Sequence, residues 1–431
     1  MTGPTKNPTA QLELLIDRAE LKRQVEDAIE SARVVDVHTH LFPPRFSGIC
    51  LYGIDELLTY HYLIAETFRS TEFQPERFWQ LGKSEQADLI WKTLFVDNTP
   101  ISEATRGVVS VLNAFGLDPR SPNLAQARQF FQSRNLTEHV DRVLDMAGVS
   151  AVVMTNDPFD DEEAAFWNKG DHRDSRFRAS LRLDGLLNNW AGAVQALAAK
   201  GWRVRVDFDD GTRSEIRRFL NEWIELLSPV YMAISLPAEF EYPANDYRNR
   251  LIREIVMPAA REHNLPLTMM VGVRRGVNPA LRAAGDGVGR ADVSALERLC
   301  AENSDVRFLA SYLSRENQHE LCVSARKFSN LMPFGCWWFL NNPSIIAEIT
   351  RERLELLGPS FIPQHSDARV LEQLIYKWKH SRTVIAESLY ESYAQLLISG
   401  RSVTRREIVR DVERMFSGNF SLLEGRRGND E

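Results

Sequence analysis

Two histidines one residue apart, His38 and His40, have the side-chain type and spacing that most directly suggest chemistry in this sequence. They follow Val34-Val35-Asp36-Val37, a run of β-branched residues typical of a buried strand. Side chains in a strand alternate between its two faces, so His38 and His40 project from the same face. Two imidazoles placed this way can bind one metal ion. The alternative is that both are polar residues at a strand end with no further role.

A carboxylate near the other end of the chain could complete the same site. Asp367 follows the last strand that the sequence predicts, over residues 361–366. In a parallel barrel the strands end at one edge, so Asp367 can reach the same axis as His38 and His40. Two imidazoles and one carboxylate leave coordination positions open for water or substrate. Asp367 could instead be a helix N-cap, a position that aspartate favours.

The elements that would position these residues alternate between strand and helix after residue 148. This alternation is typical of an α/β protein with a (β/α)8 TIM-type barrel, whose functional side chains gather after the strands. The predicted strands are 34–37, 149–155, 176–183, 231–236, 267–273, 307–312, 331–338 and 361–366. The predicted helices begin at 162 and then cover 186–200, 214–227, 247–263, 293–303, 318–328 and 345–357, with further helices to about 417. A further alternating segment, 202–208, is expected outside the barrel as a hairpin.

The residues between the first two strands contain no convincing strand of their own. Four segments there look helical and aromatic-rich, namely 53–69, 75–95, 101–115 and 123–144. A parallel strand–helix unit needs far fewer residues, so we expect a helical insertion after the first strand, over its C-terminal end. The predicted organisation is an N-terminal helix (9–31) and first strand in 1–40, the insertion in 41–147, the rest of the barrel in 148–420 and a frayed tail in 421–431.

Length and composition are those of a soluble enzyme with one large barrel or two ordinary domains. The chain has 431 residues, of which 44% are hydrophobic and 26% charged. A net charge of −7 argues against a nucleic-acid partner, although local basic clusters can still hold an acidic small molecule.

Cysteine spacing and the N-terminus bear on location. The four cysteines show no C-x-x-C spacing and fit free thiols better than a disulfide framework or zinc ribbon. Residues 1–23 are polar and mixed in charge, and no stretch is long enough to span a bilayer. We therefore expect a cytoplasmic protein with no membrane partner.

Six segments, taken in order, resemble one known family across nearly the whole chain. They are Asp36-Val37-His38-Thr39-His40; Tyr52-Gly53-Ile54-Asp55-Glu56-Leu57-Leu58 with Tyr60-His61-Tyr62; Thr155-Asn156-Asp157-Pro158-Phe159-Asp160-Asp161; Leu181-Arg182-Leu183-Asp184; Gly335-Cys336-Trp337-Trp338-Phe339; and Ser366-Asp367-Ala368-Arg369. Their order and rough spacing are similar to those of the uronate isomerases, the glucuronate/galacturonate isomerases of the amidohydrolase superfamily.

The resemblance implies a distorted (β/α)8 barrel with one divalent metal ion, zinc as the first choice, held by His38, His40 and Asp367. It implies interconversion of a hexuronate, D-glucuronate or D-galacturonate, with its ketose, fructuronate or tagaturonate. The sequence departs from the family at three places: Met269-Met270-Val271-Gly272 stands for a His-x-Gly, residues 376–382 differ from the usual Arg-His-Glu-Tyr-Phe-Arg-Arg, and Asn341-Asn342 replace an acidic residue.

This chemistry assigns roles to further residues. Moving a proton between C2 and C1 through an enediol needs a base, an acid and a group that stabilises the enediolate. Arg182 and Arg369 are candidates for the substrate carboxylate and the oxyanion, and Asp367 is a candidate base. His61 and Tyr62 could lie over the site as proton carrier and hydroxyl ligand. The alternatives are surface ion pairs for the arginines and an aromatic core for His61 and Tyr62.

Other polar or aromatic candidates have simpler explanations. Trp338 and its neighbour Trp337 are expected to pack, or one of them to line the sugar pocket. The acidic run 157–161 looks like a helix start. The pair Arg274-Arg275 is typical of a solvated face, although Arg274 follows a strand and could contact an acid group.

Two other functions compete with the isomerase. A metal-dependent hydrolase of the same superfamily commonly uses two metals and further histidines at strand ends, and here only His365 lies convincingly at one. A non-catalytic sugar-acid or metal-binding protein is the other alternative. The remaining histidines lie outside the motifs: His139, His172, His263, His319 and His380. The predicted partner is a small-molecule hexuronate, with a homo-oligomer possible; the preferred uronate and the C2 base stay open.

Overall fold

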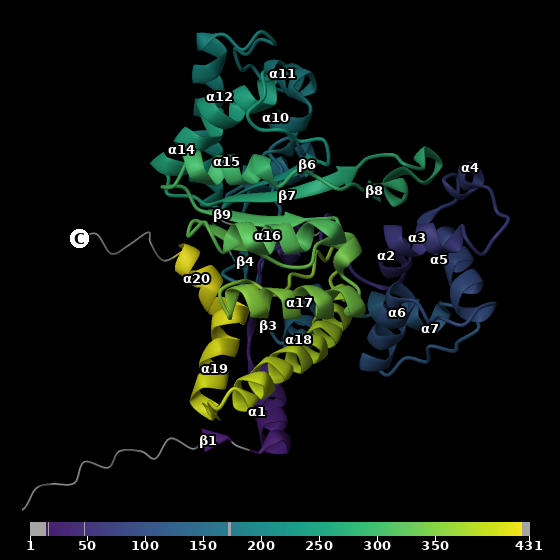
Figure 1. Ribbon diagram of the computed structural model, residues 1–431. Helices are drawn as coiled ribbons and strands as arrows, with labels where there is room; N and C mark the ends of the chain where they lie inside the picture. Colours follow the sequence, from purple (N-terminus) through teal and green to yellow (C-terminus); the bar gives the residue numbers. More distant parts are fainter. Residues whose placement is uncertain (1–13, 16, 47, 171–173, 425–431) are drawn as a thin grey trace, which may run out of the picture.

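The structure, a computed structural model, describes residues 14–15, 17–46, 48–170 and 174–424. It is a mixed α/β protein in which helices surround central parallel strands (Figure 1). One parallel sheet has the order β2 (Val34–Asp36), β3 (Val149–Val153), β4 (Phe177–Arg178). The other has the order β10 (Leu331–Pro333), β9 (Phe308–Tyr312), β7 (Leu267–Arg274), β6 (Met232–Pro237), β5 (Leu181–Arg182), and β8 (Gly287–Val288) pairs antiparallel with β7.

The strands are buried because helices cover them. All of β9 is buried, as is every residue of β7 except Arg274. A parallel sheet covered on both faces requires such continuous apolar runs rather than alternation. The strands predicted at 34–37, 149–155, 231–236, 267–273 and 307–312 are confirmed, with boundaries that differ by one or two residues.

The segment 176–183, predicted as one strand, is two short strands that join the sheets. β4 pairs with β3, and β5 pairs with β6, because the chain changes neighbours at Ala179 and Ser180. A bridge between Asn156 and Leu181, with the Arg182 amide donating to the Asn156 carbonyl over 2.9 Å, connects the two sheets here.

Backbone hydrogen bonds also connect β10 to β2 through the segment 361–368. Ile362 forms a bridge with Phe334, and further along the Asp367 amide donates to the His38 carbonyl over 3.1 Å. The prediction of a strand over 361–366 is wrong, because this segment forms an isolated bridge at Ile362 rather than a strand. The end of the segment nevertheless runs beside the end of β2. The expected strand 331–338 ends early, after Pro333, because Gly335 has a φ of +63° and lies so close to His365 that a Cβ would meet its ring at 1.9 Å.

Helices follow the strands in the predicted order, and several are broken into shorter pieces. Aspartates at N-caps begin many of them by accepting a hydrogen bond from the first-turn backbone. Before β7 they are α9 (Asp161–Trp167), α10 (Asp184–Asn188), α11 (Trp190–Ala199), α12 (Asp210–Leu227), α13 (Tyr247–Leu251), η3 (Ile252–Val256) and α14 (Met257–Glu262). After β7 they are η4 (Pro279–Gly285), α15 (Ser294–Glu302), η5 (Arg315–Asn317), α16 (Gln318–Ala325), η6 (Trp338–Leu340), α17 (Pro343–Leu357), α18 (Gln373–Ile398), α19 (Arg405–Glu413), η7 (Arg414–Gly418) and α20 (Asn419–Glu424).

Between β2 and β3 the described residues form helices and loops, and the helices of residues 54–132 gather on one side of the molecule near β8 (Figure 1). Three of the four predicted helices are divided into shorter ones, and the helix predicted over 101–115 is a single helix. The elements are η1 (Pro44–Phe46), α2 (Ile54–Leu58), α3 (His61–Thr67), α4 (Pro75–Phe78), α5 (Lys83–Trp91), η2 (Lys92–Val96), α6 (Glu103–Ala114), α7 (Ala125–Gln132) and α8 (Leu136–Ala147).

The chain termini differ from the prediction. The helix expected over 9–31 is α1 (Arg18–Ser31), capped by Asp17, and β1 (Leu14–Leu15) pairs with β11 (Val403–Thr404); residues 9–13 lie outside the described residues. Part of the expected frayed tail is helical in α20, and residues 425–431 also lie outside the described residues. The segment 202–208 forms neither a strand nor a hairpin, and Phe208 has a φ of 54°.

Cys50, Cys300, Cys322 and Cys336 are all buried and free, as expected. Among the described residues, the helices are too short or too polar to cross a membrane.

Candidate active site

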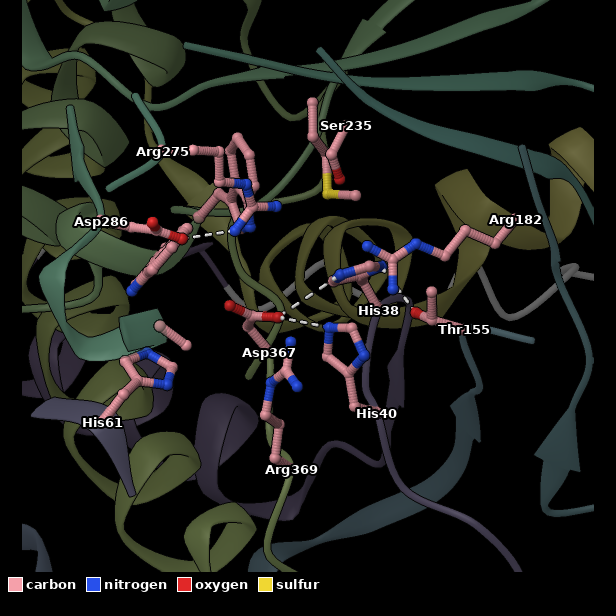
Figure 2. A pocket seen from close by; sticks show the side chains of 14 residues that line it. His38, His40, His61, Thr155, Arg182, Ser235, Arg275, Asp286, Asp367 and Arg369 are labelled. Atoms are coloured by element: carbon pink, nitrogen blue, oxygen red, sulfur yellow. Dashed lines mark hydrogen bonds and ion pairs between the residues drawn. The ribbon is translucent and has the colours of Figure 1, made fainter. Parts of the chain in front are cut away.

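His38, His40 and Asp367 come together at the end of β2. Oδ1 of Asp367 lies 3.4 Å from Nε2 of His38 and 3.4 Å from Nε2 of His40 (Figure 2). One ligand atom from each residue lies within 4.8 Å of the other two. Among the described residues this is the one group of at least three histidine, cysteine or acidic side chains with the spacing of a metal site.

The spacing and donor types fit a metal ion better than a simple ion pair. Two ligand atoms bound at 2.0–2.1 Å to a tetrahedral zinc ion lie about 3.4 Å apart. A direct charge-assisted hydrogen bond would be shorter, at about 2.7–2.9 Å. The carboxylate oxygen therefore already lies at this separation from each of the two imidazole nitrogens.

The surrounding chain holds this geometry. Asp367 has a φ of 51°, a conformation that costs energy for a residue with a side chain and persists only where the structure enforces it. The buried Asp36 carboxylate accepts hydrogen bonds from the Ser366 amide (3.0 Å) and from Nε1 of Trp378 (2.8 Å). Nζ of Lys377 donates to the Ser366 carbonyl over 2.6 Å. Residues of α18 thus fix the turn that presents Asp367.

The electrostatics favour the protonation states that metal binding needs. Burial, together with the nearby Arg369 guanidinium, lowers the pKa of His40 to about 3. Burial alone would raise the pKa of Asp367, but the neighbouring imidazoles of His38 and His40 outweigh this effect and hold that pKa well below its usual value. A neutral imidazole and an ionised carboxylate are the ligating forms.

The three residues line a cavity that opens to the solvent. Its empty volume, including the part that is open solvent, is about 580 Å³. Its wall comes from the residues that follow β2 and β3, from β5, β6 and β7, from the loop between β7 and β8, from α3, η4 and η6, and from the turn at Asp367 (Figure 2). The lining residues are His38, His40, His61, Thr155, Arg182, Ser235, Met270, Arg275, Ala283, Asp286, Trp337, Trp338, Asp367 and Arg369.

Both predicted arginines reach this cavity. Nε and Nη2 of Arg182 donate to Oδ2 of Asp184 at 2.9 and 2.6 Å, while the other oxygen of Asp184 accepts from the Ser235 amide. Burial alone would lower the pKa of Arg182, but the Asp184 carboxylate outweighs it and raises that pKa. Arg369 is exposed and lines the cavity. Together with burial, which has the larger effect, its charge lowers the pKa of His61. Neither arginine is a remote surface ion pair.

His61 and Tyr62 occupy different layers. His61 lines the cavity, and burial lowers its pKa to about 3. Tyr62 is not a lining residue; its ring lies behind His61, with ring centroids 4.5 Å apart. The Tyr62 hydroxyl and Nε2 of His61 are buried, and among the described residues neither has a hydrogen-bond partner. Trp338 lines the cavity beside His61, with ring centroids 5.4 Å apart.

Some lining residues were missed or misjudged from sequence. Arg274 is exposed, in agreement with the solvated face expected for the Arg274-Arg275 pair, whereas Arg275 lines the cavity with Asp286. Thr155, Ser235 and Met270 also line it. Thr155 follows β3, a strand-end position that the sequence could have signalled, whereas Ser235 and Met270 lie within β6 and β7. Asp160 caps α9 and the Asp157 carboxylate accepts from the Phe159 amide, as expected for a helix start.

His365 lies beside the site without joining the ligand group. Its ring centroid is 5.2 Å from that of His38 and 5.1 Å from that of Phe334. Both ring nitrogens are buried, and neither has a hydrogen-bond partner in the described part of the chain. Burial lowers the pKa of His365 well below its usual value, so its ring packs as a neutral group.

Solved structures of known proteins share this fold. A uronate isomerase from Bacillus halodurans is 52% identical and superposes with a TM-score of 0.92 over 95% of this chain and 97% of that one. A uronate isomerase from Thermotoga maritima (TM-score 0.75) and a glucuronate isomerase from Caulobacter crescentus (0.74) are each 14% identical, over 98% of this chain and 100% and 96% of theirs, and support the fold alone. Neither protein-family models nor curated proteins gave a match to the sequence.

Proposed function

Because this chain belongs to the uronate isomerase family, and is thus an isomerase, we propose that it interconverts a hexuronate aldose with its ketose. The candidate pairs are D-glucuronate with fructuronate and D-galacturonate with tagaturonate. The observation that carries the proposal is the group of His38, His40 and Asp367 inside a cavity lined by three guanidinium groups. Such a cavity suits an acidic sugar whose reaction passes through an enediolate.

The architecture we propose is a distorted (β/α)8 barrel. The two parallel sheets, the Asn156–Leu181 and Phe334–Ile362 bridges and the hydrogen bonds between 366–368 and the end of β2 support a closed ring of strands. The helical residues 41–147 would then be an insertion after the first strand, within a barrel made of 1–40 and 148–420. His38, His40 and Asp367 lie at the strand ends, where barrel enzymes carry their sites.

His38, His40 and Asp367 would hold one divalent ion, with zinc as the first candidate because their spacing suits a tetrahedral ion. A bound divalent ion supplies Lewis-acid polarisation of substrate oxygens. One such group among the described residues supports a single-ion site rather than the two-metal site of many hydrolases.

The side chains around this group can divide the proton transfer among them. Oδ1 of Asp367 faces both imidazoles, which leaves Oδ2 to take the proton from C2. Its low pKa keeps the carboxylate in the ionised form that a base requires. Arg369, beside Asp367, stabilises the enediolate oxygen, and Arg182, held rigid by Asp184, orients the acidic substrate.

His61 and Tyr62 supply polar atoms that the protein itself does not use. Both come from the start of α3, and His61 lines the cavity. Nε2 of His61 is buried without a partner among the described residues, so a bound substrate gains a hydrogen bond there without displacing another, and the Tyr62 hydroxyl, which also has no partner among these residues, lies behind the His61 ring. Trp338 provides an apolar wall for the sugar carbons.

The direct test is ketose formation from each hexuronate by metal-loaded protein. The wild type should convert at least one of the two, and Asp367→Asn should lower kcat/KM by about 10³-fold or more, since ligand and base are lost together. Asp305→Asn, which alters an exposed carboxylate paired with Arg261, is the matched control and should behave as the wild type. Absence of ketose from both substrates would refute the proposal.

A further inference from the structure

Arg275 and Asp286 form an ion pair that extends the β7–β8 hairpin into the cavity. The antiparallel register pairs Val273 with Val288 and Arg274 with Gly287, so Arg275 and Asp286 are the next facing positions. Nη1 of Arg275 donates to Oδ2 of Asp286 over 2.5 Å. Facing residues of an antiparallel pair have neighbouring side chains, so the contact follows from the register itself.

The carboxylate of this pair is fixed. The side chain of Asp286 is only 6% exposed, and its Oδ1 accepts a hydrogen bond from the Gly276 amide over 2.8 Å. The preceding Gly285 closes the loop, since a Cβ there would lie 1.8 Å from the Asn278 carbonyl oxygen. Asp286 therefore acts as a rigid anchor.

The loop itself rests on the helices between β2 and β3. η4 contacts α3 and α4, and Nε1 of Trp79 donates to the Ala280 carbonyl over 2.8 Å. Figure 1 shows β8 and this loop extending from β7 toward those helices. The helices that place His61 over the cavity therefore also hold the Asp286 side of it.

The Arg275 guanidinium keeps N–H donors that can bind a ligand. The side chain of Arg275 is 62% exposed, and Arg275 lines the cavity with its guanidinium 6.0 Å from the centre of the Trp338 ring. Among the described residues, Asp286 is its one hydrogen-bond acceptor, and it engages Nη1. Because a guanidinium has five N–H donors, most of them can bind a ligand. An anchored arginine with free donors is well suited to bidentate binding of a carboxylate or oxyanion.

Arg275 and Arg182 lie on opposite sides of the cavity in Figure 2, with Asp367 lower in the view. The lining contains three arginines, Arg182, Arg275 and Arg369, and two carboxylates, Asp286 and Asp367. During isomerisation a hexuronate carries negative charge at both ends, as its carboxylate and as the enediolate oxygens. The cavity thus offers a cation to each end of a six-carbon chain.

We propose that Arg275, anchored by Asp286, is a second acid-binding subsite that holds the charged end of the open-chain sugar acid lying away from His38, His40 and Asp367. This assignment rests on the proposed function and adds a specificity-determining residue to it. It predicts that the cavity prefers six-carbon ligands with acid groups at both ends. A six-carbon aldarate, which has two carboxylates and cannot isomerise, is the simplest such ligand.

The test is calorimetric titration of metal-loaded protein with a six-carbon aldarate and with the matching aldonate, which has one carboxylate. The wild type should bind the aldarate more tightly. Arg275→Met should weaken aldarate binding by about 10- to 100-fold, the usual effect of losing charge-assisted hydrogen bonds, and leave aldonate binding unchanged. Arg274→Met removes the exposed neighbouring arginine and should match the wild type.

Two further variants guard against misfolding. Arg275→Lys keeps the charge but not the bidentate fork and should fall between wild type and Arg275→Met; Asp286→Asn releases the guanidinium and should weaken the aldarate selectively. Equal weakening of both ligands, no preference for the aldarate in the wild type, or equal effects of Arg274→Met and Arg275→Met would overturn the proposal. Ketose formation by the wild type is measured separately, so loss of the subsite and loss of the isomerase assignment are distinguishable.

Discussion

The Asp367 amide donates a hydrogen bond to the His38 carbonyl over 3.1 Å, and the side chains of the same two residues approach to 3.4 Å between Oδ1 and Nε2. This backbone hydrogen bond fixes the two Cα atoms relative to each other, and so the points from which both side chains extend. The imidazole–carboxylate spacing is therefore a property of the packed strand ends rather than of side-chain rotamers alone. A site prepared in this way requires little rearrangement to bind an ion.

Replacing His38 and His40 together with asparagine should abolish tight metal binding, because one carboxylate cannot hold the ion alone. Metal analysis of the purified protein measures this directly. His319→Asn, an exposed histidine, is the control and should retain the wild-type metal content. Stoichiometric metal in the double variant would contradict the ligand assignment.

Arg369→Met should raise KM for the hexuronate and lower kcat, with a combined loss of about 10²- to 10³-fold, because a donor to the developing oxyanion is removed. Steady-state kinetics with purified, metal-loaded protein gives both constants. Arg351→Met breaks an exposed pair with Glu391 and should change neither. Unchanged kinetics for Arg369→Met would remove this residue from the site.

Tyr62→Phe should lower kcat by about 10- to 100-fold without lowering the thermal midpoint of unfolding. The buried hydroxyl has no partner among the described residues, so its removal costs the fold no hydrogen bond, whereas the hydroxyl behind His61 that we propose for the proton transfer is lost. Parallel measurements of kcat and Tm separate the two effects. A lower Tm with unchanged kcat would show that Tyr62 serves packing alone.

His380 should make the protein sensitive to acid. Burial, with Lys377 and Arg106 nearby, lowers its pKa to about 4, and its side chain is 19% exposed. Between about pH 6.5 and 4 the unfolded chain binds a proton that the folded state does not, so stability falls as pH falls through this window. The difference amounts to about 3 kcal/mol.

His380→Gln removes the titrating imidazole, so the free energy of unfolding should depend less on pH. The free energy of unfolding, measured by denaturant titration at pH 6.5 and pH 4, should fall about 3 kcal/mol less in the variant than in the wild type. His319→Gln, at an exposed position, should follow the wild type. Parallel profiles for wild type and His380→Gln would disprove the effect.

The buried strands were predictable because local composition carries their signal. The run before His38 is apolar except for Asp36, the run over 267–273 is apolar except for Thr268, and the period of two set the direction of the histidines. The meeting of His38, His40 and Asp367 was an expectation from barrel geometry, and the structure places them together.

Other features depend on contacts that no local pattern encodes. The strand expected to reach Trp338 ends early because Gly335 approaches the ring of His365 from a distant segment. Arg275 rather than Arg274 faces the cavity because a two-residue strand, β8, sets the hairpin register. β8 is too short to be recognised in the sequence, yet its pairing with β7 determines which of the two arginines lines the cavity.

Incubation of the metal-loaded protein with D-glucuronate and, separately, D-galacturonate in heavy water, followed by proton NMR, tests the central claim most directly. We expect the ketose to form from at least one of these sugar acids. Deuterium should enter at C1 of the ketose or at C2 of the recovered aldose, through exchange of the proton held by the base. No ketose and no deuterium from either sugar acid, in protein that carries its metal, would contradict it.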